Sequence, residues 1–301
     1  MGELWRMSAL ELAAMIRGRE VSSREVVQAH LDRVQAVNHH VNAMVRLLPE
    51  TALAAADEAD RVVAGGGRLG PLHGVPFSVK ENIDVAGTPT TQGVRALAEA
   101  TAPVDAPSVE RLRAAGAIPF ARTNLPDFAL RVHTDSALHG LTRNPWHPGR
   151  TSGGSSGGEA AAVASGMSPL GLGTDLGGSL RNPAHCCGVA SIKPSAGAVP
   201  VARTIPAEDM PISYQLMAVE GVLARRVADL RAGFTAIAGQ HPRDPLSVPA
   251  VFTGLAPRAR PPVAVLAEPP GGSTHPDVAA AVRRAAGALC DDGFEVTDAV
   301  P

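Results

Sequence analysis

The sequence predicts an α/β protein in which helices cover both faces of a β-sheet. Segments with apolar residues at helical spacing alternate along the chain with short apolar runs of strand length. With 301 residues, of which 45% are hydrophobic, the chain is long enough to bury a large core. Residues 262–301 have the pattern of a strand, a helix and a second strand, which is the repeating unit of sheets with parallel strands.

The first three helices are predicted from their start signals and their apolar spacing. Ser8–Glu11 and Ser22–Glu25 each match a capping box, in which a serine and a glutamate three residues later satisfy free backbone N–H groups. Residues at helical spacing give the second helix a buried face: Val27, Leu31, Val34 and Val37. An alanine-rich helix is expected over 50–64, where three glycines end it.

The remaining elements follow from apolar runs and turn residues. A short strand is expected over 75–79, with Lys80 at its end, and a small-residue helix is expected between Ser155 and Ser179. Further helices are predicted near 109–115 and over 222–238 and 276–289. Further strands are predicted over 117–121, 188–192, 262–267 and 294–300.

Two serines lie in separate glycine-rich turns, Ser155 in GGSSGG and Ser179 in DLGGSLR, 24 residues apart. Glycine allows a backbone to approach a substrate closely and to adopt turns that are closed to other residues. A serine in such a turn can act as a nucleophile if a nearby group takes its proton. No histidine lies beside either serine, so Lys80 is the leading candidate for the base.

Each of these features also has an ordinary structural interpretation. A GGSSGG run alone is more often a flexible linker, but here a helix-forming EAAAVASG segment follows it directly. The run also satisfies the G-x-S-x-G pattern of α/β-hydrolases, which requires a strand immediately before it, and residues 144–150 are a poor strand. A lone lysine at a strand end is usually a solvated surface charge.

Taken together, these motifs resemble the amidase signature family of serine hydrolases. The resemblance extends over the opening helices, GPLHGVPFSVKENIDVAGTPTTQG, RLRAAGAIPFARTNLPDFA and the serine region, and it is most specific over 70–194. It implies a mixed sheet covered by helices on both faces and a single domain. Within that domain we expect a helical part (1–68), a catalytic core (69–240), a linker (241–261) and a βαβ unit (262–301), without the C-terminal part of the family's fold.

The resemblance also implies a Ser–Ser–Lys triad. Ser179 would be the nucleophile, Ser155 a bridging serine joined to Gly154 by a cis peptide, and Lys80 the terminal base. Lys80 then needs a lowered pKa, because a free lysine near 10.4 is a poor base at neutral pH. Burial beside the apolar residues 76–79 would lower this pKa, and the nearby Glu81 and Asp84 would oppose the effect.

Further site residues are implied around the triad. Backbone N–H groups of the nucleophile turn would form the oxyanion hole: Leu176, Gly177, Gly178 and Ser179. Ala129, in an acyl pocket made by 125–134, would contact the substrate and leave room for a bulky or aromatic acyl group. Ser156, Asp175 and Arg181 would support the two turns, although Asp175 and Arg181 could equally form an ordinary structural ion pair.

The function expected from this resemblance is hydrolysis of a carboxylic amide to an acid and ammonia or an amine, through an acyl-enzyme on Ser179. One alternative is the glutaminase A subunit of a glutamyl-tRNA amidotransferase complex. Another is a shortened non-catalytic remnant or interaction subunit. Departures from the family's usual residues at Ser191, Ala198 and Val222 leave the triad intact and favour a stand-alone enzyme.

Composition restricts the partners and the compartment. A net charge of −2 and only 3% aromatic residues argue against nucleic acid as the main ligand. No cofactor is implied, the ten histidines lack metal-ligand spacing, and no apolar run is long enough to span a membrane. Three cysteines, two of them adjacent, favour a reducing cytoplasm over a disulfide framework: Cys186, Cys187 and Cys290. A small-molecule amide is the expected partner, and a homodimer is left open.

Overall fold

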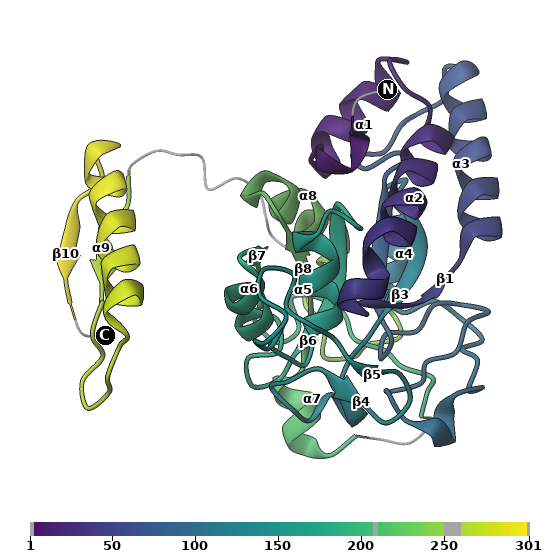
Figure 1. The fold of residues 1–301 in the computed structure, drawn as a ribbon. Coiled ribbons are helices and arrows are strands. Elements are labelled where there is room, and N and C mark those ends of the chain that lie inside the picture. Colours follow the sequence, from purple (N-terminus) through teal and green to yellow (C-terminus); the bar gives the residue numbers. More distant parts are fainter. Residues whose placement is uncertain (1–2, 207–209, 250–259, 300–301) are drawn as a thin grey trace. The chain divides into compact units, whose positions relative to one another are not determined.

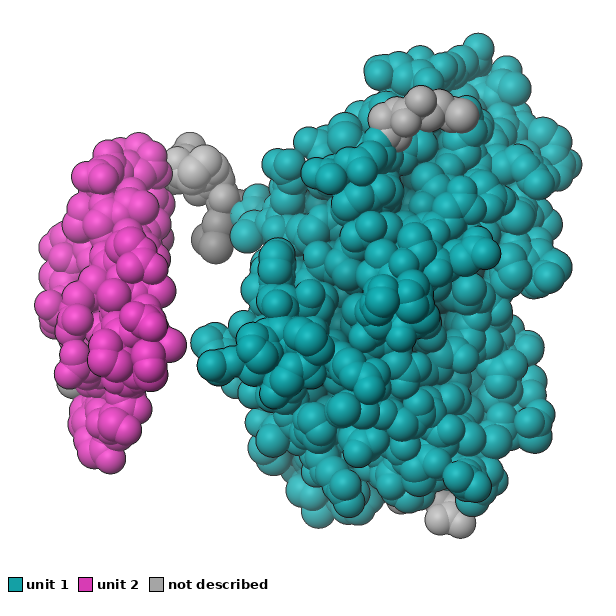
Figure 2. All heavy atoms as spheres, in the orientation of Figure 1, with its two compact units in different colours: residues 1–250 teal, residues 251–301 magenta. Residues whose placement is uncertain are grey.

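A computed structural model describes residues 3–206, 210–249 and 260–299 of the chain. The chain divides into two compact units, residues 1–250 and residues 251–301 (Figure 2). The first unit contains a six-stranded sheet that carries the candidate site, and the second contains a small βαβ unit.

The large sheet is mixed, as predicted (Figure 1). Its strand order is β1-β3-β2-β6-β8-β7, and β2 runs parallel to both of its neighbours, β3 and β6. The other pairs in this sheet are antiparallel. The strands are β1 (Met44–Leu47), β2 (Pro76–Lys80), β3 (Ile118–Thr123), β6 (Leu170–Asp175), β7 (Ala190–Ser191) and β8 (Val219–Ala224). A separate hairpin joins β4 (Asp135–Ser136) and β5 (Gly140–Leu141).

Most of the helices begin where the sequence signals place them. The capping boxes at Ser8 and Ser22 are both formed and open the first two α-helices. The α-helices of this unit are α1 (Ala9–Arg17), α2 (Ser23–Val41), α3 (Pro49–Ala64), α4 (Pro107–Ala114), α5 (Gly157–Ala164), α6 (Arg181–Cys187), α7 (Ile212–Met217) and α8 (Val227–Ile237). Three short 3-10 helices are η1 (Leu4–Arg6), η2 (Arg95–Leu97) and η3 (Asp127–Ala129).

Two apolar clusters cover the two faces of the sheet. On one face, Phe77 and Val79 of β2 pack with buried residues of α1, α4 and α8. On the other face, Phe120 of β3 packs with buried residues of α2, α3 and α5. Because side chains alternate along a strand, Ser78 and Lys80 leave the backbone of β2 on the side opposite to Phe77 and Val79. The prediction of helices on both faces is confirmed.

The prediction of one helix over 222–238 is wrong at its start. Residues Val219–Ala224 form strand β8, which pairs with β6 over six residues, and the helix begins only at Val227. All six residues of β8 are buried, so the strand shows no alternation that would distinguish it from a buried helix. Strand β6 is missing from the sequence prediction for the same reason, because its six residues are also all buried.

The C-terminal unit matches its predicted βαβ pattern. Strands β9 (Val263–Val265) and β10 (Val296–Asp298) pair in parallel, and α9 (Pro276–Asp291) connects them. The expected linker, 241–261, lies partly outside the described residues.

One buried histidine makes the stability of the first unit dependent on pH. His30 of α2 is fully buried, its Nδ1 lies 2.8 Å from the Val26 carbonyl oxygen, and its Nε2 has no hydrogen-bond partner among the described residues. Burial, assisted by the charge of Arg225, lowers the pKa of His30 from 6.5 to about 4. The unfolded chain therefore binds a proton near pH 6.5, while the folded chain remains neutral at this position until about pH 4.

We predict that this difference destabilises the fold by about 3 kcal/mol as the pH falls from 6.5 to 4. His30→Leu should remove this part of the acid sensitivity in urea unfolding measured across that range. His40→Leu, at an exposed position of the same helix, should keep the wild-type slope. Equal slopes for wild type and His30→Leu would contradict the prediction.

Candidate active site

The candidate base lies at the end of a buried strand. Lys80 is the last residue of β2 and is fully buried. Its Nζ lies 2.7 Å from the hydroxyl oxygen of Ser155 and 2.7 Å from that of Thr174. The parallel arrangement of β2 and β6 places Thr174 beside Lys80, although the two residues are 94 positions apart in sequence.

Burial has the largest effect on the pKa of this lysine. It lowers the pKa of Lys80 well below 10.5, and the positive charge of Arg203 lowers it further. The negative charges of Glu159 and Asp175 oppose the shift. The sequence analysis expected Glu81 and Asp84 to oppose the lowering of the Lys80 pKa. This expectation is wrong, because the opposing acids are Glu159 and Asp175.

The first glycine-rich turn is joined directly to the second. The Gly154–Ser155 peptide is cis, as the resemblance implies, and Ser155 is buried. The Ser156 backbone N–H donates to the Ser179 carbonyl oxygen at 3.1 Å, and the Ser156 hydroxyl donates to the Thr174 carbonyl oxygen at 3.1 Å. Residues 144–154 form no strand, so the geometry required for an α/β-hydrolase elbow is missing from this described segment.

Asp175 organises the turn that carries Ser179. Its carboxylate accepts hydrogen bonds from the backbone N–H groups of Gly178 (2.8 Å) and Leu180 (2.9 Å). Arg181 binds the same carboxylate through Nε (3.0 Å) and Nη2 (2.9 Å). Burial alone would raise the pKa of Asp175, but hydrogen bonds from Arg181, Leu180 and Gly178 outweigh it and lower this pKa to about 2. The carboxylate therefore holds the turn over the ordinary pH range.

The turn itself faces open space. Ser179 is partly exposed, and within the described structure its hydroxyl has no hydrogen-bond partner, not even Ser155. A Cβ built on Gly177 or Gly178 would meet no atom within 4 Å. The N–H groups of Leu176, Gly177 and Ser179 have no acceptor among the described residues, whereas the Gly178 N–H is already bonded to Asp175. The structure thus brings Lys80 to Ser155 and leaves Ser179 free at the surface.

The segment that contains Ala129 lies against the first serine turn. Phe128 and Ala129 both have positive φ, and the backbone of 131–133 packs closely against Gly154. Large apolar side chains of this segment are exposed to solvent: Phe128, Leu130 and Val132. Ala129 itself is half-buried, and its N–H donates to the Pro126 carbonyl oxygen.

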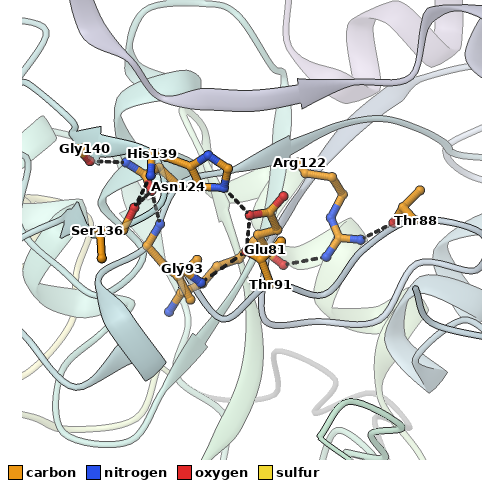
Figure 3. A network of polar contacts seen from close by, with 12 residues as sticks. Glu81, Thr88, Thr91, Gly93, Arg122, Asn124, Ser136, His139 and Gly140 are labelled. Carbon is orange, nitrogen blue, oxygen red and sulfur yellow. Dashed lines mark hydrogen bonds and ion pairs between the residues drawn. The ribbon is translucent and has the colours of Figure 1, made fainter. Parts of the chain in front are cut away.

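A network of polar contacts holds the backbone that follows Lys80 (Figure 3). Arg122 is buried and donates from Nη2 to the carbonyl oxygens of Lys80 (3.4 Å) and Ile83 (2.6 Å). Glu81 accepts a hydrogen bond from Thr91 and lies 2.6 Å from Nε2 of His139. The chain after β2 is thereby fixed to β3 and to the loop between β4 and β5.

Sequence reasoning missed three residues around the triad: Glu159, Thr174 and Arg203. Glu159 could have been singled out, because it is the one charged residue within the apolar run of α5. Thr174 lies in a strand that was itself not predicted, and Arg203 lies in a loop without a motif.

Within the described part of the chain, no group of three or more histidine, cysteine or acidic residues could hold a metal ion, and no helix could cross a membrane.

Comparisons with known proteins show the family of the chain. The family model described as Amidase matches residues 25–301. The chain is 47% identical over 297 residues to an indoleacetamide hydrolase of Bradyrhizobium diazoefficiens, covering 99% of this chain and 57% of that protein. It is 42% identical over 266 residues to the A subunit of a glutamyl-tRNA(Gln) amidotransferase from Acidothermus cellulolyticus, covering 86% of this chain and 50% of that protein.

Solved structures of amide hydrolases are also similar to this chain. A 6-aminohexanoate cyclic dimer hydrolase complexed with substrate superimposes with a TM-score of 0.87 at 34% identity, covering 99% of this chain and 61% of that one. The native peptide amidase from Stenotrophomonas maltophilia superimposes with a TM-score of 0.82 at 30% identity, covering 98% of this chain and 62% of that one. The chain thus spans between half and two thirds of the length of these relatives.

The close packing at Gly154 leads to a prediction about stability. A Cβ at this position would lie 2.7 Å from the His133 nitrogen and 2.8 Å from the Val132 carbonyl carbon. Gly154→Ala should therefore force the backbone of 131–133 to move and lower the free energy of unfolding by about 1–3 kcal/mol. Gly177→Ala, where the Cβ meets open space, is the matched control and should leave stability unchanged. Urea unfolding of both variants measures the difference, and equal stabilities would show that residues 131–133 are not packed against Gly154 as described.

Proposed function

Because the chain belongs to the amidase family, we propose that it hydrolyses the C–N bond of a carboxylic amide to an acid and ammonia or an amine. The observation that carries this proposal is the 2.7 Å contact between the buried Lys80 and Ser155, beside a glycine-rich turn with a free serine hydroxyl. Burial lowers the pKa of Lys80 well below 10.5, which favours the neutral amine, the form that can accept a proton.

In the first half of the reaction, the Ser179 hydroxyl oxygen attacks the amide carbonyl carbon. The Ser179 proton passes to Ser155, and Ser155 passes its own proton to Lys80. The tetrahedral intermediate then collapses, the C–N bond breaks, and the leaving nitrogen receives a proton by the reverse route. The product of this half is an ester between Ser179 and the acyl group. Water then attacks the ester in the same way and releases the acid.

The negative charge on the tetrahedral oxygen needs hydrogen-bond donors. We assign this role to the backbone N–H groups of Leu176, Gly177 and Ser179, which are free of other acceptors in the described structure. The Gly178 N–H, also expected in this set, is bonded to Asp175 and holds the turn instead. Asp175 and Arg181 position the second turn, and Ser156 joins it to the first.

The acyl group would lie along the segment that contains Ala129. The exposed side chains of Phe128 and Leu130 on this segment favour an apolar or aromatic acyl group. Indoleacetamide is therefore the first substrate to test, since a relative with 47% identity is an indoleacetamide hydrolase. Glutamine is the second candidate, since several relatives are glutamyl-tRNA(Gln) amidotransferase A subunits.

We also propose a small-molecule partner and a cytoplasmic location. The net charge of −2 supports a small-molecule partner and no nucleic acid. Three unpaired cysteines support a reducing, cytoplasmic location. The absence of a cofactor remains a prediction from the family resemblance, and the oligomeric state is left open.

We predict that a fluorophosphonate probe labels Ser179, identified by mass spectrometry of the modified peptide. Ser179→Ala should abolish the label, because it removes the attacking oxygen. Lys80→Ala should slow labelling by about 10²- to 10⁴-fold, because the proton of the serine pair loses its acceptor. Label on Ser155 would contradict the assigned roles. No label on the folded protein would support the interpretation as a non-catalytic remnant.

A second measurement separates the two candidate substrates. Released ammonia should be detected with indoleacetamide and the purified chain alone, and Ser179→Ala should abolish it. Release from glutamine only, and only with the other components of an amidotransferase added, would favour the glutaminase function instead.

A further inference from the structure

A second buried carboxylate lies next to the lysine of the proposed reaction and has no role in the steps described above. Glu159 is in the first turn of α5, four residues after Ser155, and is fully buried. Helix α5 packs against the face of the sheet opposite to Phe77 and Val79, which is the face on which Ser78 and Lys80 leave β2.

Two hydroxyl groups hold this carboxylate in place. Ser78 donates to Oε2 of Glu159 at 2.6 Å, and Thr123 donates to Oε1 at 2.8 Å. Ser78 is two residues before Lys80 on β2, and Thr123 is the residue that pairs with Lys80 on β3. Both anchors of the carboxylate are therefore immediate neighbours of the lysine.

The charge of Glu159 is not neutralised by an ion pair within the described structure. The other carboxylate near Lys80, that of Asp175, is bound at both oxygens by Arg181. Burial raises the pKa of Glu159 to about 7, against hydrogen bonds from Ser78 and Thr123 and the positive charges of Lys80 and Arg122. Three charged groups shift the pKa of Lys80: Arg203 from the loop before α7, Glu159 from α5 and Asp175 from β6.

We propose that Glu159 is a positioning residue that acts through Lys80, setting its charge state and stabilising the ammonium that forms when Lys80 accepts the Ser155 proton. The proposal rests on the amidase function proposed above. Glu159 itself exchanges no proton in this scheme: the proton moves from Ser155 to the Lys80 nitrogen and returns to the leaving nitrogen. A buried ammonium without a nearby negative charge is strongly disfavoured, so the step needs such a partner.

The composition of the chain allows a direct test, because it contains only two lysines, Lys80 and Lys193. Lysine labelled with ¹³C at Cε gives two signals, and the pH midpoint of each can be followed by NMR. Glu159→Gln keeps the shape of the side chain and removes its charge. The Lys80 midpoint should fall by about one pH unit or more, and the Lys193 midpoint should not change.

Glu220→Gln is the matched control. Glu220 is also a buried glutamate bonded to a serine hydroxyl, that of Ser108, and burial raises its pKa to about 7 as well. It lies on β8 opposite Thr174, and its charge is not among those that shift the pKa of Lys80. This variant should leave the Lys80 midpoint at its wild-type value.

The same variants are then compared in the pH profile of fluorophosphonate labelling. Glu159→Gln should move the acid limb of the profile to lower pH and reduce the plateau rate about tenfold, because Lys80 becomes a weaker base. A variant that only loosened packing would lower the rate without moving the limb.

The outcomes separate the two proposals. An unchanged or raised Lys80 midpoint in Glu159→Gln overturns the role of Glu159, as does a wild-type Lys80 that never titrates while the protein is folded. An equal fall in Glu220→Gln also overturns it, because the effect would then not depend on position. A lowered midpoint without any labelling of Ser179 in wild type would support the electrostatic pairing and reject the amidase function.

Discussion

The buried contact between Lys80 and Ser155 is the constraint on which the rest of the site depends. A lysine side chain without solvent requires hydrogen-bond partners and compensating charge, and the fold supplies both from different elements. Ser155 comes from the turn before α5, Thr174 from β6 and Glu159 from the first turn of α5. The parallel pairing of β2 with β6 and the packing of α5 on the sheet are therefore conditions for the chemistry as well as for the core.

Much of the site could be predicted from the sequence, because its motifs are local. Two serines in glycine-rich turns and a lysine at a strand end indicate a serine hydrolase without a histidine. The capping boxes at Ser8 and Ser22 placed the first helices correctly, since a cap depends on residues only three positions apart. The proposed catalytic roles of the three residues follow from the family resemblance, and the contact between Lys80 and Ser155 is consistent with them.

The parts that could not be predicted depend on contacts between distant residues. Strands β6 and β8 are buried throughout, so their sequences carry neither the period of a strand nor that of a helix. The charges that act on Lys80 could not be found by sequence distance either. Glu81 and Asp84 are its near neighbours in sequence, but Glu159 and Asp175 are the acids that oppose its pKa shift. The pairing of β2 with β6 brings Asp175 close to Lys80, and the packing of α5 on the sheet brings Glu159 close.

Burial acts on the two members of the Lys80–Glu159 pair in opposite directions. It lowers the pKa of the lysine and raises that of the glutamate, so each group is brought toward neutrality by the same packing. Their mutual attraction works against both shifts, and the balance depends on how tightly α5 closes over β2 and β3. The small residues Ala160 and Ala161 allow this close approach. The alanine-rich composition of α5 thus supports the proposed protonation state of the base as well as the packing of the sheet.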